Sequence, residues 1–341
     1  MKPKDRDFLE TKENLIFCVV GYLHPPDRVT SYLKYVPSKD GIWKKGELRY
    51  KRTLNYYHVS QVEGTYSYLE KNYPDYIFHD NVRNIKISAV PKAKISKYYR
   101  PQKRMREILE NPVDILEEKA YKIVKKIEQK INIEDKIGVT GSVLTRSHNP
   151  TFSDLDFTVY GWENVMKVKR EILDLKSKGF MRFLSEKELE IWCKERNQKF
   201  PLSVSELRRI ASRRWNFGYF NDTYFSFHAT RNDNEITEVY GDNLYTKLGE
   251  VAGTGIVSDV KESLYNPAIY KIRDSSIDTK DVVLSEIVTY ESLYSGLFDM
   301  GDKVQFKGVL EKVEGKKNYN RVILGAAGTK NSYVKWFTPQ D

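Results

Sequence analysis

Apolar and polar residues alternate in the middle of the chain with the period of a β-strand. Successive side chains of a strand point to opposite faces of its sheet. Leu155, Phe157 and Val159 therefore lie on one face, and Asp154 and Asp156 lie on the other. The pattern predicts a strand that packs one face on a core and holds two carboxylates on the other.

A second alternating segment, residues 222–230, predicts another strand. Phe225 and Phe227 lie on its apolar face, whereas Ser226 and His228 lie on its polar face. We expect its apolar face to pack on the same core.

The helical period of about 3.6 residues predicts helices on both sides of the Asp-x-Asp strand. Asn111 can cap the first helix, Pro112 suits its first turn, and Asp114 complements the helix dipole. Its apolar stripe consists of Leu116, Ala120, Ile123, Val124, Ile127 and Ile131. Further helices are predicted over residues 162–178, from Ser185 and from Ser203, the last two with capping-box sequences.

Short β-like segments separated by polar turns occupy both ends of the chain. In the N-terminal part they include residues 15–22 and 85–90, and residues 94–104 form a basic segment that resembles a connector. In the C-terminal part they are residues 253–260, 268–272, 301–313 and 321–325. We expect the C-terminal segments to form a small closed or nearly closed sheet, of which an oligonucleotide-binding barrel is one example.

These elements predict an α+β protein with three domains, because 341 residues exceed one ordinary domain. A mixed or β-rich recognition domain is expected at residues 1–105. A central domain with a mixed sheet and helices is expected at residues 106–245, and a β-rich, barrel-like domain at residues 246–341.

A turn before the Asp-x-Asp strand has the residues of a phosphate-binding site. Gly141 and Ser142 follow a short predicted strand, and glycine allows a phosphate to approach the backbone closely. Asp154 and Asp156 lie about 7 Å apart along an ideal strand and repel one another unless a cation or a proton intervenes. Hard oxygen ligands of this kind suit Mg²⁺ (or Mn²⁺), which binds through one or two carboxylates and the phosphates of a substrate. The pattern indicates a site for metal and a nucleoside triphosphate.

The Gly-Ser turn and the Asp-x-Asp strand together resemble the nucleotidyltransferase superfamily of DNA polymerase beta, which includes CCA-adding enzymes, poly(A) polymerases and antitoxin-type transferases. The matching residues are Gly141, Ser142, Asp154 and Asp156, and the resemblance covers about residues 113–240. The sequences around both motifs, residues 139–142 and 153–156, are also similar to those of a group of archaeal predicted nucleotidyltransferases. The resemblance implies a nucleotidyltransferase-type mixed sheet with helices in the central domain, catalytic metal ligands at both aspartates, and phosphate binding at the Gly-Ser turn.

Members of this superfamily usually have a third acidic residue on a later strand, and here its place is open. The polar face of residues 222–230 has no carboxylate at its middle. Asp222, at the entrance to the strand, is our first candidate for this catalytic role, and Glu235 and Glu238 are alternatives. His228 is a further candidate, as a base, because its side chain titrates nearest neutrality.

Composition favours anionic partners and disfavours a membrane. The chain has 57 Lys and Arg against 47 Asp and Glu, for a net charge of +10. It lacks an apolar run of the roughly 18 residues that span a membrane, and its start resembles no signal peptide, so we expect a cytoplasmic protein. Cys18 and Cys193 are isolated, and their spacing predicts neither a zinc site nor a disulfide framework.

Basic residues next to tyrosines occur at residues 34–35, 50–52 and 56–58. Two interpretations stay open: the tyrosines stack on nucleic-acid bases while the cations contact phosphates, or the tyrosines pack at strand edges beside solvated lysines. The helix that follows Ser203 is rich in arginine, and Arg208 and Arg209 are candidate nucleotide-binding residues. A salt-bridged basic helix is the alternative.

The sequence therefore predicts a metal-dependent nucleotidyltransferase. It would transfer a nucleoside monophosphate from a nucleoside triphosphate to an acceptor hydroxyl, with RNA or DNA as the first candidate for the acceptor. The alternatives are a catalytically degenerate protein that binds nucleotide or nucleic acid, and an antitoxin-like protein adenylyltransferase.

Overall fold

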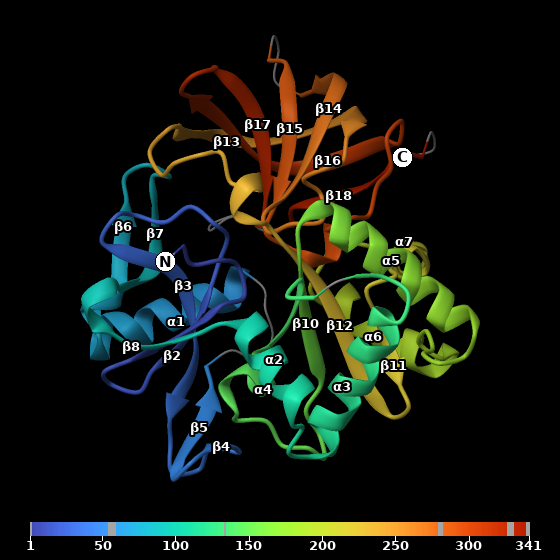
Figure 1. Cartoon of the computed structure of the whole chain (residues 1–341). Helices are drawn as coiled ribbons and strands as arrows, with labels where there is room; N and C mark the ends of the chain where they lie inside the picture. The colour runs from blue at the N-terminus through green and yellow to red at the C-terminus, as the bar shows by residue number, and fades with distance from the viewer. Residues whose placement is uncertain (1, 54–58, 133, 279–281, 326–330, 339–341) are drawn as a thin grey trace. The chain divides into compact units, whose positions relative to one another are not determined.

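The computed structural model describes residues 2–53, 59–132, 134–278, 282–325 and 331–338 of an α+β protein (Figure 1). Residues 56–58, one of the predicted basic-aromatic segments, lie outside these ranges. The chain divides into two compact units. The first consists of residues 1–55, 88–184 and 215–237, and the second of residues 56–87, 185–214 and 238–341.

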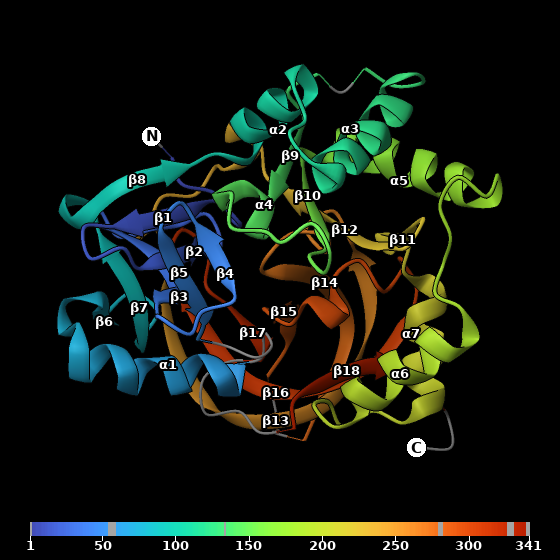
Figure 2. The same cartoon turned by 90° about the horizontal axis from the view of Figure 1, so that it is seen from below.

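The first unit contains an antiparallel N-terminal sheet with the strand order β4-β5-β3-β2-β1-β8. Its strands are β1 (Phe8–Thr11), β2 (Ile16–Val19), β3 (Arg28–Pro37), β4 (Trp43–Lys45), β5 (Leu48–Arg52) and β8 (Ile95–Tyr99). The last residues of β7 (Ile85–Pro91) also pair with β3. Phe8, Tyr35 and Tyr50 from three of these strands are buried in one hydrophobic cluster with Leu144. Leu144 belongs to α4 (Gly141–Thr145), and Figure 2 shows α4 beside β4 and β5.

The first unit also contains a four-stranded mixed sheet with the order β11-β12-β10-β9. Its strands are β9 (Ile137–Thr140), β10 (Leu155–Tyr160), β11 (Phe217–Phe220) and β12 (Thr223–Thr230). β10 runs parallel to β12 and antiparallel to β9. Phe157 and Phe227 are register partners, and their buried rings stack with centroids 4.8 Å apart. The apolar faces predicted for β10 and β12 thus form the core of this sheet.

Three longer helices belong to the same unit: α2 (Pro101–Glu110), α3 (Ile115–Glu128) and α5 (Trp162–Ser177). α3 begins later than predicted. Its N-cap is Asp114, whose side chain accepts hydrogen bonds from the backbone N–H groups of Leu116 and Glu117, so the prediction that Asn111 caps it was wrong. A carboxylate is the better cap here because it bonds two free N–H groups at once.

The predicted basic connector at residues 94–104 was also wrong. This segment begins with the last residue of the 3₁₀ turn Lys92–Lys94, continues as strand β8 and ends in the first turn of α2, which has Pro101 at its N-terminus. Charge suggested an exposed segment, yet Arg104 is buried because Glu117 of α3 neutralises it.

The second unit contains α1 (Val59–Asn72), α6 (Glu186–Asn197), α7 (Val204–Arg213) and a barrel-like sheet. The capping boxes predicted at Ser185 and Ser203 are confirmed. The barrel strands are β13 (Leu244–Asp259), β14 (Ala268–Ile277), β15 (Leu284–Thr289), β16 (Lys303–Glu314), β17 (Tyr319–Leu324) and β18 (Tyr333–Trp336). Pairing runs from β13 through β14, β15, β17 and β16 and returns to β13, with β15 parallel to β17 and β18 added to β16.

The remaining elements of the second unit are β6 (Ile77–Asp80), which pairs with the beginning of β7, and the 3₁₀ turns Pro74–Tyr76 and Ser292–Tyr294. The 3₁₀ turn Asp233–Glu235 belongs to the first unit. The three domains at residues 1–105, 106–245 and 246–341 are a different division of the chain and stay a prediction.

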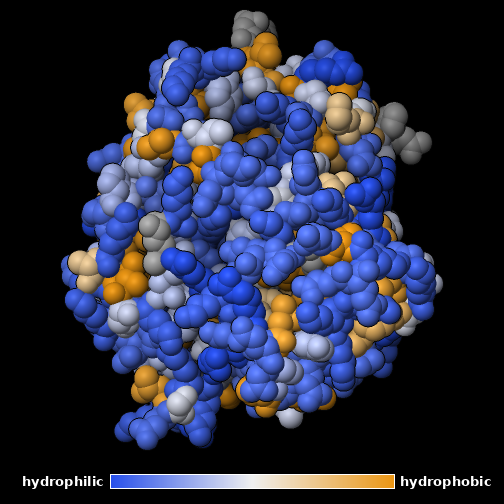
Figure 3. Space-filling view, viewed as in Figure 1, coloured by the Kyte–Doolittle hydropathy of each residue, from blue (hydrophilic) through white to orange (hydrophobic). Residues whose placement is uncertain are grey.

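Figure 3 shows one face of the molecule, which is mostly hydrophilic with apolar residues in small groups. Within the ranges described above, every helix is too short or too polar to cross a membrane.

Lys176, near the end of α5, is a buried amine whose lowered pKa predicts that stability depends on pH. Its Nζ donates hydrogen bonds to the carbonyl oxygens of Trp215 (2.9 Å) and Phe217 (2.7 Å), and burial lowers its pKa to about 7. The unfolded chain, with an ordinary lysine pKa of about 10.4, binds more protons between these two values. Stability should therefore rise with pH from about 7 to about 10.

We expect Lys176→Met to flatten this dependence, which chemical denaturation at pH 7, 8.5 and 10 would measure. Lys167→Met, at an exposed position of the same helix, is the matched control and should keep the wild-type slope. An unchanged slope in Lys176→Met would show that this ammonium is not the group responsible.

Candidate paired-aspartate site

The Gly-Ser turn lies beside the second aspartate of the pair. β9 ends at Thr140, which is the register partner of Asp156 on β10, and α4 begins at Gly141. Gly141 has a φ of 68°, a conformation that favours glycine. A Cβ at this position would lie 3.1 Å from Oδ2 of Asp156. The turn therefore brings backbone within contact distance of the carboxylate, and it leaves little room for a larger residue.

The two aspartates lie at the entrance to β10 and influence one another. Asp154 immediately precedes the strand, Asp156 is its second residue, and both are partly buried. The charge of Asp156, followed by burial, raises the pKa of Asp154 above its ordinary value. Burial alone would raise the pKa of Asp156 as well, but hydrogen bonds from His228 and Ser226 hold it well below its usual range. The pKa values of the two carboxylates are thus shifted in opposite directions, as expected of two close carboxylates.

Ser226 and His228 occupy the strand next to this pair. Ser226 is the register partner of Asp156 across the parallel strands, and its hydroxyl donates a hydrogen bond to Oδ1 of Asp156. His228 Nε2 lies 2.7 Å from Oγ of Ser226 and 3.7 Å from Oδ1 of Asp156. The polar face of β12 therefore reaches the site with a hydroxyl and an imidazole.

Three cations from the N-terminal sheet and its leading segment act on the same carboxylates. Lys34 of β3 is buried, and its charge lowers the pKa of both aspartates. Arg52, the last residue of β5, acts in the same sense on Asp154. Arg6 interacts electrostatically with Asp156, and its carbonyl oxygen accepts a hydrogen bond of 2.7 Å from the hydroxyl of Thr140. Positive charge thus comes to the aspartates from outside residues 113–240, the part of the chain that resembles the DNA polymerase beta superfamily.

The structure does not bring Asp222 to the aspartate pair. It precedes Ser226 by four residues, which is about 13 Å along a strand. Its side chain is exposed and lies 2.6 Å from Nζ of Lys119 on α3, a contact that lowers its pKa. Glu235 accepts hydrogen bonds of 2.8 Å from the backbone N–H groups of Trp162 and Asn232, and so holds the start of α5. Glu238 belongs to the second unit.

Arg208 and Arg209 lie on α7 in the second unit, where they contact protein groups. Arg208 pairs with Glu186 of α6, which raises its pKa. The guanidinium of Arg209 lies 4.1 Å from the ring centroid of Trp336 on β18. Their predicted role in nucleotide binding stays a prediction.

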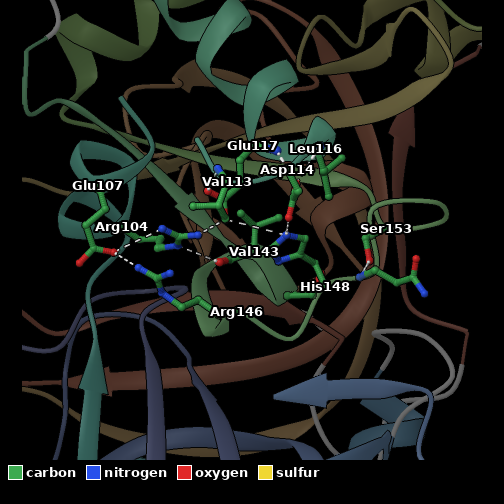
Figure 4. Close-up of polar contacts among 12 residues, drawn as sticks. Arg104, Glu107, Val113, Asp114, Leu116, Glu117, Val143, Arg146, His148 and Ser153 are labelled. Atoms are coloured by element: carbon green, nitrogen blue, oxygen red, sulfur yellow. Dashed lines mark hydrogen bonds and ion pairs between the residues drawn. The ribbon is translucent and has the colours of Figure 1, made fainter. Parts of the chain in front are cut away.

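A second cluster fixes the loop that connects the Gly-Ser turn to the aspartates (Figure 4). His148, in this loop, lies 2.7 Å from Oδ2 of Asp114 and 3.9 Å from Oε1 of Glu117. Arg104 donates to the same Glu117 and, over 3.3 Å, to the carbonyl oxygen of Val143 in α4. The cluster therefore ties the junction of α2 and α3 to both α4 and the loop.

Three of these side chains, Asp114, Glu117 and His148, come close enough together to hold a metal ion. The carboxylate oxygens already accept hydrogen bonds: Oδ1 of Asp114 from two backbone N–H groups, and Oε2 of Glu117 from the N–H of Val113 over 3.2 Å. Arg104 also supplies a positive charge. The arrangement is that of a capping and ion-pair network that positions the loop.

Sequence reasoning overlooked Arg6 and His148, and it considered Lys34 and Arg52 only as contacts for nucleic-acid phosphates or as solvated residues. Lys34 gave the clearest signal, because it interrupts an otherwise apolar stretch of strand at residues 33–36. A charge at a buried strand position requires a partner, which the sequence does not identify.

The fold and the site define a class: an α+β protein in which two adjacent aspartates and a Gly-Ser turn meet at one end of a four-stranded mixed sheet. The chain is 31% identical over 342 residues to the "Uncharacterized protein MJ1086" of Methanocaldococcus jannaschii, and the alignment covers 98% of this chain and 99% of that protein. The chain belongs to the same family as MJ1086. No protein-family model and no solved structure matched it.

Proposed function

We propose that the protein is a metal-dependent nucleotidyltransferase whose catalytic sheet is β11-β12-β10-β9. The observation that supports this most is the meeting of Gly141, Asp154 and Asp156 at one end of the sheet. The order of strand, Gly-Ser turn, loop and Asp-x-Asp strand is the order by which the sequence resembles the DNA polymerase beta superfamily, and in the structure the turn continues into the short helix α4.

The donor set of the site suits a hard divalent cation. Two carboxylates supply oxygen ligands, and the charge of Asp156, followed by burial, raises the pKa of Asp154, so a divalent cation between the carboxylates would relieve their repulsion. Asp154 and Asp156 would hold Mg²⁺ or Mn²⁺, which would neutralise charge on the phosphate oxygens during transfer. The Gly141–Ser142 turn would bind phosphates of the nucleotide through its backbone.

His228 would accept the proton of the attacking hydroxyl. A bond forms between the acceptor oxygen and the α phosphorus, the bond from the α phosphorus to the bridging oxygen breaks, and pyrophosphate leaves. Ser226 would hold the imidazole at a fixed distance from Asp156. A histidine in this place performs the proton transfer for which other members of the superfamily use a third carboxylate.

Nucleic acid is the first candidate for the acceptor. The closed order of β13 to β17, with parallel β15 and β17, supports a barrel of the oligonucleotide-binding type. The net charge of +10 also favours a polyanionic acceptor.

The direct test incubates the protein with labelled nucleoside triphosphates, Mg²⁺ or Mn²⁺, and RNA, DNA or protein in separate reactions. Labelled RNA or DNA, with one pyrophosphate released per nucleotide added, would support the proposal. Labelled protein would instead indicate the antitoxin-like adenylyltransferase.

A degenerate nucleotide-binding protein is the second candidate, and one observation favours it. The residue that faces Asp156 across the strands is Ser226, whose hydroxyl is a weaker metal ligand than a carboxylate. Nucleotide binding without transfer to any acceptor, at every pH and with both metals, would establish this second function.

A further inference from the structure

The loop between α4 and β10, residues 146–154, is attached to the N-terminus of α3 by His148. We propose that His148 is a positioning residue of the metal site: its hydrogen bond to Asp114 fixes this loop and thereby the place of Asp154. The inference rests on the proposed function, which makes Asp154 a metal ligand. It concerns a side chain outside the two motifs by which the chain resembles nucleotidyltransferases.

The two aspartates are held in different ways. Asp156 lies within β10, where Thr140 of β9 and Ser226 of β12 are its register partners. Asp154 precedes the strand, and the pairing of β10 begins after it, at Leu155. The sheet therefore fixes Asp156, whereas the position of Asp154 depends on the loop that leads into the strand.

A closed turn connects His148 to Asp154. The backbone N–H of Asn149 donates a hydrogen bond of 3.0 Å to Oγ of Ser153. The N–H of Ser153 donates one of 2.9 Å to the carbonyl oxygen of Asn149. Asn149 directly follows His148, and Ser153 directly precedes Asp154. The turn is therefore a compact unit with the imidazole at one end and the first aspartate at the other.

The acceptor of the His148 hydrogen bond is itself held in place (Figure 4). Oδ1 of Asp114 accepts hydrogen bonds from the backbone N–H groups of Leu116 (2.9 Å) and Glu117 (3.0 Å). Oδ2 of Asp114 lies 2.7 Å from Nε2 of His148. The buried Arg104 of α2 donates to the side chain of Glu117. The N-terminus of α3 is therefore a fixed point of attachment for the loop.

The surroundings of the imidazole determine which nitrogen donates. The side chain of His148 is 7% exposed, and Nδ1 is buried without a hydrogen-bond partner among the residues that the structure describes. A proton on Nδ1 of the neutral ring would leave a buried N–H unbonded and turn a lone pair of Nε2 toward the carboxylate. The neutral ring therefore has its proton on Nε2 and donates it to Asp114. Because the acceptor is a carboxylate, this is a charge-assisted hydrogen bond.

An ion pair on the surface also connects this loop to a helix. Arg146, the first residue of the loop, is exposed and lies 2.9 Å from Oε2 of Glu107 on α2. Water screens an exposed pair, so it holds the chain weakly. The hydrogen bond of His148 is shielded from water, and we expect it to fix the loop.

The test compares the affinities of variants for Mn²⁺ alone. In His148→Leu, which lacks the donor, the Kd should rise roughly tenfold, the scale seen when a group that orients a metal ligand is lost. In His148→Gln, the amide N–H can donate to Asp114 from about the place of Nε2, so most of the wild-type affinity should return. Electron paramagnetic resonance of free Mn²⁺ would give the Kd values.

A double-mutant cycle shows where the effect acts. If His148 works by placing Asp154, the His148→Leu substitution should change the Kd less than about twofold in the Asp154→Asn background. A general loosening of the fold would weaken Mn²⁺ binding by the same factor in both backgrounds. Additive effects of the two substitutions would therefore overturn the inference.

Asp114→Asn breaks the same hydrogen bond from the other side, so it decides the matter if His148→Leu does not fold. Asparagine caps a helix about as well as aspartate does. Its amide nitrogen would take the place of Oδ2 and cannot accept a hydrogen bond from Nε2. The Kd for Mn²⁺ should rise as in His148→Leu. Arg146→Met, at the exposed start of the same loop, is the matched control and should keep the wild-type Kd.

The remaining outcomes separate this inference from the proposed function. If Asp154→Asn weakens Mn²⁺ binding while His148→Leu and Asp114→Asn bind like the wild type, the inference fails and the proposed function stands. If Asp154→Asn leaves Mn²⁺ binding unchanged, the ion binds elsewhere, for example at His148 itself. In that case, or if the wild type binds no Mn²⁺, the proposed function fails together with this inference.

Discussion

Asp154→Asn and Asp156→Asn should each abolish nucleotide transfer but change stability in opposite directions. Either substitution removes a carboxylate that would hold the proposed metal, and a metal ion contributes several kcal/mol of transition-state stabilisation where it acts in catalysis. We expect a rate loss of at least about 10³-fold in each variant. The measurement is the initial rate of pyrophosphate release with saturating acceptor.

The expected stability changes follow from the directions of the two pKa shifts. The folded state raises the pKa of Asp154, so its ionised form opposes folding, and Asp154→Asn should be more stable than the wild type at neutral pH. The folded state lowers the pKa of Asp156, so its ionised form favours folding, and Asp156→Asn should be less stable. Each change should be on the order of 1 kcal/mol.

The pH dependence gives an independent check. The gain in stability of Asp154→Asn over the wild type should grow as pH rises above about 4, where the aspartate of the unfolded wild type ionises. The loss of stability in Asp156→Asn should shrink as pH falls, because Asp156 takes a proton at a higher pH in the unfolded chain than in the folded one. Melting temperatures without added metal at pH 4, 5.5 and 7 would show both trends.

Asp222→Asn is the matched control for these variants. Asp222 begins a strand of the same sheet, but its carboxylate is exposed and paired with Lys119. We expect the variant to keep the wild-type rate. A loss as large as that of Asp154→Asn would restore Asp222 as the third catalytic acid, and an unchanged rate in Asp154→Asn itself would refute the site.

Much of the local structure could be predicted from the sequence because it depends on neighbours in the chain. The capping boxes at Ser185 and Ser203 and the alternation in β10 and β12 are local signals. The Gly-Ser turn also lies within a few residues of β9, and its contact with Asp156 follows from strand pairing.

What could not be predicted depends on partners that are distant in the sequence. Lys34 and Asp154 are 120 positions apart, and no periodicity relates them. Arg104 is buried beside Glu117, which neutralises it, so its charge indicated an exposed connector where the chain forms a helix. The place of Ser226 opposite Asp156 also required the register of β10 and β12.

His228→Gln should lower the rate of transfer by roughly 10²–10⁴-fold, the usual range for loss of a general base. The amide side chain can still bond the hydroxyl of Ser226, but it cannot take a proton from the acceptor. The Kd for a nonhydrolysable ATP analogue should change little, because the imidazole is not among the proposed phosphate ligands. The pH–rate profile should also lose the acidic limb that protonation of a base produces.

A carboxylate at Ser226, the register partner of Asp156, should restore part of the activity that His228→Gln loses. Ser226→Asp in the His228→Gln background places a carboxylate directly opposite Asp156, where it can ligate metal and accept the proton. We expect the double variant to recover part of the lost rate and to bind Mn²⁺ more tightly than His228→Gln alone. If His228→Gln keeps the full rate, the imidazole is not the base. If the wild type is inactive while Ser226→Asp alone transfers nucleotide, the natural protein is the degenerate binder, because a single carboxylate then separates it from an enzyme.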